Sequence, residues 1–192
     1  MGRPPKYDAD RLLDAAGDLV AAAGPSAVTM SAVAEAVGAP SGSVYHRFPD
    51  RPALMAALWM RTMQRFQEGV LETMRLDPPH RAVSHTARYV VEWARRNPRD
   101  AAIMLAGAAE FAQSEWTEAA RDSLQRSNAA VTAAVTDLVR RLGGRHARDT
   151  DRVTIAMVDL PMATVRRYFR TGRAIPPYAA GLVERAAAAM LS

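Results

Sequence analysis

The feature that most constrains the fold is the stretch Gly38–Phe48, GAPSGSVYHRF, together with the helix-length segments on either side of it. Gly38 suits the end of a helix over Met30–Val37, because glycine adopts a left-handed backbone there without steric cost. Pro40 suits the first turn of a second helix, which we expect to run from about Ser41 to the end of the stretch. The sequence therefore predicts two short helices joined by a tight turn.

Such a pair is a helix-turn-helix, whose second helix lies in the DNA major groove. The alternative is a plain corner in a helical bundle. The surface of the second helix favours DNA binding, because it offers small or donor-bearing residues: Ser41, Gly42, Ser43, Tyr45, His46 and Arg47. Val44 and Phe48, four residues apart, form its inward stripe.

The segment Leu12–Trp59 resembles the N-terminal domain of the TetR family of transcriptional repressors. The family's motifs occur in order: an alanine-rich first helix ending in glycine, a Thr-Met pair, the G-x-x-x-G-x-x-Y turn and recognition helix, and F-P-D-R. The resemblance implies an all-α chain. Residues 1–52 would form a three-helix helix-turn-helix DNA-binding domain, at whose end a fourth helix begins. Residues 53–192 would form a helical effector-binding and dimerisation domain.

Candidate contacts to double-stranded DNA extend beyond the second helix. Arg3 belongs to a short basic arm, which is either a minor-groove or phosphate contact or a disordered tail. Thr29 is the expected N-cap of the first helix of the pair and could also donate to a phosphate. The resemblance makes Arg51 a phosphate contact, with a solvated charge as the alternative. We expect Tyr45 and His46 to touch phosphates and Ser41 or Arg47 to lie nearer the bases.

The charge distribution leaves a second function open. The 192-residue chain has a net charge of +5, which is compatible with nucleic acid. Residues 1–50, however, hold six carboxylates against four basic side chains. This acidic balance is the best support for the alternative function, a small-molecule-binding helical protein without DNA binding. An activator of the same family would differ only in promoter context.

Other classes of function find no support in the sequence. There is no cysteine, and the four histidines, His46, His80, His85 and His146, show no metal-ligand spacing. No phosphate-binding loop or G-x-S-x-G motif is present, so we expect no enzyme, cofactor or metal. No apolar run approaches the roughly 18 residues of a membrane span, and the N-terminus lacks a signal peptide. We therefore expect a cytoplasmic protein without membrane contact.

The later helices carry bulky residues that the resemblance assigns to an effector cavity. Ordinary core packing is the alternative for each of them. With one carboxylate, the candidates are Trp59, Met63, Phe66, Tyr89, Trp93, Met104, Phe111, Trp116, Met157, Asp159 and Leu160. Asp159 and Glu110 lie among apolar neighbours, so each should pair with an arginine, lie at the surface or meet a ligand. The small-molecule effector should be largely apolar.

The last two helices are predicted to form a homodimer interface. We expect helices over about residues 114–142, 151–171 and 177–191, with a loop at residues 145–152 and a kink at Pro161. By resemblance, the last two would form a two-fold four-helix bundle with a partner subunit; an intramolecular hairpin is the alternative. The candidate interface residues are Val153, Leu160, Thr164, Leu182, Val183, Ala186 and Met190.

Overall fold

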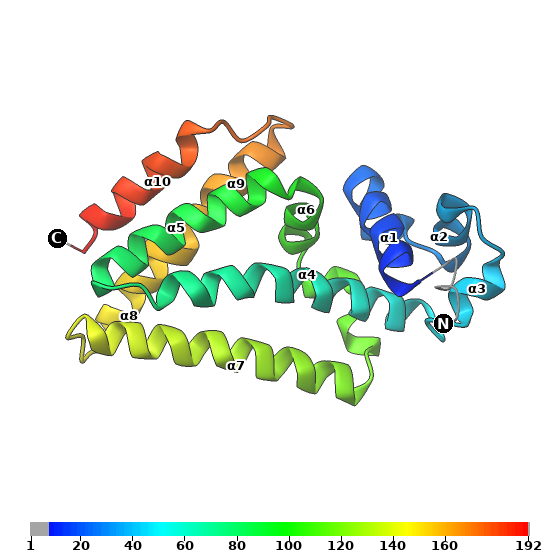
Figure 1. Ribbon diagram of the computed structural model, residues 1–192, viewed down its shortest axis with the longest axis horizontal. Coiled ribbons are helices and arrows are strands. Elements are labelled where there is room, and N and C mark those ends of the chain that lie inside the picture. Colours follow the sequence, from blue (N-terminus) through cyan, green and yellow to red (C-terminus); the bar gives the residue numbers. More distant parts are fainter. Residues whose placement is uncertain (1–7, 192) are drawn as a thin grey trace, which may run out of the picture. The chain divides into compact units, whose positions relative to one another are not determined.

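The structure, a computed structural model, describes residues 8–191, and these form helices and connecting turns without a strand (Figure 1). Within these residues, no helix is both long enough and apolar enough to cross a bilayer. The all-α prediction is confirmed. The α-helices are α1 (Ala9–Ala23), α2 (Met30–Val37), α3 (Ser41–Tyr45), α4 (Arg51–Met74), α5 (Pro79–Arg96), α6 (Pro98–Ala106), α7 (Glu118–Arg141), α8 (Ala147–Thr154), α9 (Leu160–Arg170) and α10 (Tyr178–Ala189). Shorter turns are η1 (Pro25–Ala27), η2 (Ala108–Phe111), η3 (Gln113–Glu115) and the π-helical η4 (Ile155–Asp159).

The chain divides into two compact units, and each is discontinuous in sequence. Unit 1 consists of residues 1–63 with 98–124, and unit 2 consists of residues 64–97 with 125–192. Helices α4 and α7 each contribute to both units. This division follows packing and differs from the predicted functional boundary at residue 52, which stays a prediction.

Local capping fixes the helix starts in unit 1. The carboxylate of Asp8 accepts a hydrogen bond from the Arg11 N–H at 2.8 Å and is the N-cap of α1. Thr29 caps α2 in the same way, through the Ala32 N–H at 3.0 Å. Asp50 accepts from the Ala53 N–H at 2.8 Å at the start of α4. Each cap depends only on an N–H three residues further along the chain, and the cap predicted at Thr29 is confirmed.

The apolar core of unit 1 joins the first three helices to residues that follow much later in the chain. Leu12, Val33 and Val44 are fully buried, one from each of α1, α2 and α3. The same core cluster contains α4 side chains and the later residues Ile103, Phe111, Trp116 and Leu124. The three-helix core is therefore completed by the segment 98–124.

Unit 2 is organised around α5, which packs against α9, η4 and α10 (Figure 1). The side chains of α5 that face these partners are apolar and buried, among them Val83, Val90 and Val91. Small residues of α10, including Ala179, Ala180 and Ala187, are buried in return. Small side chains let two helix backbones approach closely, which explains the tight pairing of α5 with α10.

Three helices depart from the predicted boundaries. The recognition helix α3 ends at Tyr45 rather than Phe48, with Arg47 N–H donating to the Val44 carbonyl in a tightened last turn. Helix α7 begins at Glu118 rather than near residue 114, because Ala112 has a left-handed backbone (φ 56°) and residues 113–115 form a 3₁₀ turn. The predicted loop at residues 145–152 is mostly helix α8.

The helix predicted over residues 151–171 is interrupted. The π turn η4 separates α8 from α9, and the Leu160 N–H donates to the carbonyl of Ile155, five residues earlier. Pro161 is buried in the first turn of α9. Proline has no N–H to continue the α-helical pattern, so a local irregularity at this position is expected. In the structure, this irregularity is the π turn directly before Pro161.

Candidate DNA-binding and effector sites

The helix-turn-helix has the geometry that its sequence predicts. Gly38 ends α2 with a left-handed backbone (φ 66°, ψ 37°). The turn is closed by the Ala39 N–H, which donates to the Ala34 carbonyl at 2.9 Å. Val44 is fully buried and Phe48 is 8% exposed. These two side chains anchor α3 to the core and leave its other face in solvent.

The exposed face of α3 presents the predicted contact residues. Ser41, Gly42, Tyr45, His46 and Arg47 are exposed, and Ser43 is half-buried. Tyr45 is 53% exposed, although a large aromatic side chain would ordinarily be covered. Hydroxyl, imidazole and guanidinium groups here can all donate to phosphate oxygens or base edges.

The other predicted DNA contacts have different surroundings. Arg3 lies outside the described residues. Thr29 is exposed, but its hydroxyl oxygen is used as the N-cap of α2. Arg51 donates from Nε to the Val28 carbonyl at 2.6 Å and from Nη2 to the Pro25 carbonyl at 2.9 Å. Two of its donor nitrogens are thus used inside unit 1, and its phosphate contact stays a prediction.

The acidic side chains of α1 are paired with arginines from outside residues 1–50. Arg61 of α4 contacts the carboxylates of Asp10 at 3.2 Å and Asp14 at 2.9 Å. Arg99 of α6 contacts Asp14 at 3.0 Å and Asp18 at 3.3 Å. The acidic balance of residues 1–50 is therefore offset within unit 1, which weakens the argument for a protein without DNA binding.

Arg99 crosses α1 at a glycine. A Cβ atom at Gly17 would lie 3.0 Å from Cδ of Arg99, so the missing side chain makes room for the arginine stem. Partial burial acts to lower the pKa of Arg99, but the hydrogen bond to Asp18 and the charges of Asp14 and Asp100 outweigh it and raise that pKa. Arg99 therefore stays charged and links α6 to α1. Nothing in sequence reasoning identified this contact.

The predicted effector residues of unit 1 include an aromatic cluster. The rings of Trp59 and Phe111 lie 5.3 Å apart between centroids, and Trp116 is 2% exposed in the same core. Met63 and Met104 are half-buried. The indole Nε1 of Trp59 is buried, and no described residue accepts a hydrogen bond from it. A buried donor without an acceptor is costly and marks a place where a ligand could supply one.

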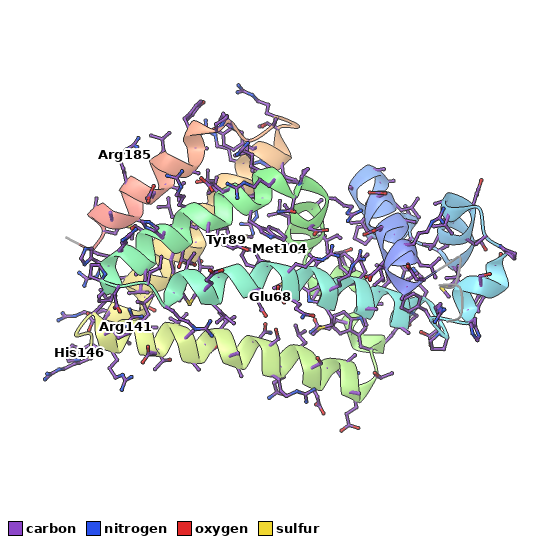
Figure 2. The ribbon with its side chains drawn as sticks, viewed as in Figure 1. Glu68, Tyr89, Met104, Arg141, His146 and Arg185 are labelled. Carbon is purple, nitrogen blue, oxygen red and sulfur yellow. The ribbon has the colours of Figure 1, made fainter. Side chains whose placement is uncertain are left out.

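The predicted residues of unit 2 form a second cluster. Phe66 lies 5.0 Å from Trp93 and 6.1 Å from Tyr89, measured between ring centroids. Tyr89 lies on α5, with Glu68 on α4 (Figure 2), and its hydroxyl donates to the Phe66 carbonyl at 3.2 Å. Burial raises the pKa of Tyr89, and the negative charges of Glu68 and Glu72 add to the effect. This phenol therefore remains protonated and able to donate.

The remaining members of the predicted set are dispersed. Met157 is fully buried, Leu160 is half-buried, and Asp159 is exposed, as is Glu110. Of the three alternatives for these carboxylates, both therefore show the surface position, so neither needs an arginine partner. The structure also has a shallow, open depression on one face of α7, which the sequence did not indicate. Its lining residues are Gln125, Asn128, Ala129, Thr132, Ala133, Thr136, Asp137 and Arg140.

The predicted interface residues separate into buried and exposed sets. Val153 and Val183 are 2% and 4% exposed, so they belong to the core of unit 2. Leu160, Thr164 and Met190 are half-buried, while Leu182 and Ala186 are exposed. Sequence reasoning missed three exposed apolar residues, Ile155 (44%), Val158 (37%) and Tyr178 (65%). In residues 8–191 no group of three or more His, Asp or Glu side chains could hold a metal ion.

An exposed second helix on a three-helix core is the arrangement of a helix-turn-helix DNA-binding domain. Residues 12–58 match the family of bacterial regulatory proteins, tetR family. No curated protein sequence matches the chain.

Solved structures share the fold over nearly the whole length. PfmR, a TetR-family transcriptional regulator from Thermus thermophilus, is 16% identical, with a TM-score of 0.71 and 96% of each chain covered. A TetR-family regulator from Marinobacter aquaeolei is 14% identical, with a TM-score of 0.73 and 95% and 94% coverage. FadR from Bacillus subtilis, solved in complex with stearoyl-CoA, is 14% identical, with a TM-score of 0.70 and 96% and 97% coverage. These likenesses, all below 25% identity, show a shared fold, and the match to the tetR family covers residues 12–58.

Proposed function

We propose that this protein is a cytoplasmic repressor that binds a palindromic operator as a homodimer and is released by a small-molecule effector. The observation that carries the proposal is the exposed polar face of α3, held on a buried Val44 and Phe48. Two such helices, one per subunit, would enter successive major grooves about 34–36 Å apart.

The homodimer is supported by the exposed apolar residues of η4 and α10. Ile155 and Val158 lie on η4, and Tyr178 and Leu182 lie on α10, and these two elements contact each other. Exposed apolar side chains grouped on adjacent elements are typical of an interface. Ala186 lies four residues after Leu182 and is also exposed, so it extends the same face of α10.

The effector is proposed to be largely apolar with at least one hydrogen-bond acceptor. Apolar and aromatic side chains dominate both predicted clusters, and the buried Trp59 Nε1 lacks an acceptor. FadR from Bacillus subtilis was solved with stearoyl-CoA, which combines an acyl chain with polar groups. For a nearly complete switch, the effector must bind the released form more tightly by about 5.5 kcal/mol.

The test is an electrophoretic mobility shift with the purified protein and DNA from its own upstream region, at moderate salt with excess competitor. We expect a specific complex at nanomolar protein, a footprint with two-fold symmetry, and weaker binding as salt rises. Tyr45→Phe with Arg47→Ala should weaken the complex and flatten its salt dependence.

Absence of a specific shift, on upstream DNA and on a selected random library, would contradict the operator-binding proposal. The small-molecule-binding protein without DNA binding would then be the better function. If DNA binds, the same assay identifies effectors by release. Acyl-CoA esters and the matching free fatty acids are the first compounds to compare.

A further inference from the structure

The helical run from the last turn of α8 through η4 into α9 has one buried and one exposed face. Four-residue steps define the buried face: Val153, Met157, Pro161 and Val165 are all buried. Four-residue steps also define the opposite face, which we call the exposed ladder: Ile155, Asp159, Ala163 and Arg167 are all exposed. The wider π turn offsets part of the drift that four-residue steps make on a helix of 3.6 residues per turn.

On the exposed ladder, two side chains of opposite charge lie at equal distances in sequence on either side of Ala163. Asp159 lies four residues before Ala163, and Arg167 lies four residues after it. Within the part of the chain that the structure describes, neither charged side chain has an ion pair. The acid of α10, Glu184, is held by Arg88 at 2.8 Å.

We propose that a second copy of the chain covers the exposed ladder, with the two-fold axis at Ala163 and the two helices antiparallel. In a two-fold interface, if residue i contacts residue j then j contacts i. An axis at Ala163 thus pairs Asp159 with the partner subunit's Arg167, twice per dimer. The small Ala163 side chain permits close approach at the axis. The inference rests on the proposed homodimer and adds its register.

The charge pairs mainly determine the relative orientation of the two subunits. A parallel arrangement of the two ladders would place Asp159 beside the partner subunit's Asp159, and like charges at an interface oppose association. The apolar residues nearby, Ile155 and Val158 on η4, supply contact area without fixing direction. Apolar burial therefore drives association, and the ladder determines how the subunits align.

The experiment exchanges charges between subunits. In the Asp159→Arg variant both charged residues of the ladder are positive, and in the Arg167→Asp variant both are negative. Each variant alone should therefore place like charges opposite each other and dimerise at least tenfold more weakly than the wild-type chain. Mixed together, the two variants should form heterodimers in clear excess over the statistical half, because each pairing then joins opposite charges. Sedimentation velocity measures the single variants, and native mass spectrometry of differently tagged chains measures the mixture.

Two further variants serve as controls. Arg145→Asp reverses an exposed arginine outside the ladder and should leave dimerisation unchanged. The double variant Asp159→Arg with Arg167→Asp should recover the wild-type dissociation constant within about threefold, which excludes misfolding as the cause. Statistical mixing, or no recovery in the double variant, overturns the register while the wild-type dimer stands. A wild-type chain that is monomeric at micromolar concentration contradicts the homodimer itself.

Discussion

Arg47 and Arg51 are four residues apart, yet their guanidinium groups have different surroundings. Arg47 is exposed on the recognition helix. Arg51 is tied to the backbone carbonyls of Val28 and Pro25, which precede α2. Arg47 is thus open to solvent, and Arg51 holds the connection between α1 and α2 against the start of α4.

Alanine substitutions should separate these two roles. Arg51→Ala removes two hydrogen bonds from a charged donor and should lower the free energy of unfolding by about 2 kcal/mol. Arg47→Ala should change stability by less than about 0.5 kcal/mol but weaken operator binding. Urea denaturation and mobility shift measure the two quantities. Equal loss of stability in both variants would contradict this division.

Residue roles that depend on neighbours in sequence could be predicted, and those that depend on distant carbonyls could not. The caps Asp8, Thr29 and Asp50 bond to N–H groups three residues away. The acceptors of Arg51 lie more than twenty residues before it. No local pattern identifies such partners, and the phosphate contact that the resemblance implies for Arg51 stays a prediction.

Helix α8 is the clearest case in which a single side chain stabilises a helix where the composition predicted a loop. The segment 145–152 is rich in charges and was predicted as a loop. The Asp149 carboxylate accepts hydrogen bonds from the Arg145 N–H at 2.8 Å and the His146 N–H at 2.9 Å. A carboxylate that satisfies N–H groups at a helix start stabilises it. The helix therefore begins at Ala147 despite its polar composition.

The same carboxylate should make α8 sensitive to acid. The backbone hydrogen bonds from Arg145 and His146 lower the pKa of Asp149 below its ordinary value of 3.8. A depressed folded-state pKa stabilises the fold above the unfolded pKa, and this stabilisation is lost as the pH falls through the folded pKa. Asp149→Asn should remove that contribution. Urea denaturation of both chains from pH 6 downward should show their difference shrinking below about pH 4; a constant difference would contradict the assignment.

The irregular π and 3₁₀ turns are the elements that the sequence did not predict. Pro161 predicted a disturbance in its helix, but proline chemistry alone does not distinguish a kink from the π turn that is present. The 3₁₀ turns η2 and η3 precede α7 because Ala112 adopts a left-handed backbone. Alanine gives no signal for that conformation, which depends on packing around Phe111 and Trp116.

At the scale of the whole molecule, the homodimer interface stays a prediction, and burial divides its predicted residues into two sets. Leu182 and Val183 are adjacent, yet Leu182 is 52% exposed and Val183 is 4% exposed. Both helix faces are apolar in sequence, so the pattern could not determine which one packs against α5. The structure turns Leu182 outward and Val183 inward, and only the first can meet a partner.

Leu182→Glu should therefore break the dimer without unfolding the subunit. An exposed leucine contributes little to the monomer, whereas a carboxylate placed in an apolar interface is costly. Multi-angle light scattering should show a monomer with unchanged helicity, and the affinity for a two-half-site operator should fall at least tenfold. Gln125→Glu, at an exposed site on α7, is the matched control. A dimeric Leu182→Glu chain would place the interface elsewhere.

The helix-turn-helix belongs to a unit whose core is discontinuous in sequence. Residues 12–58 match the family domain, yet Ile103, Phe111 and Trp116 complete their core, and Arg99 holds the first helix across Gly17. A chimera made by exchanging the first sixty residues between relatives would thus join two halves of different cores. Transplanting operator specificity calls for moving residues 98–124 as well, or for rewriting only the exposed side chains of α3.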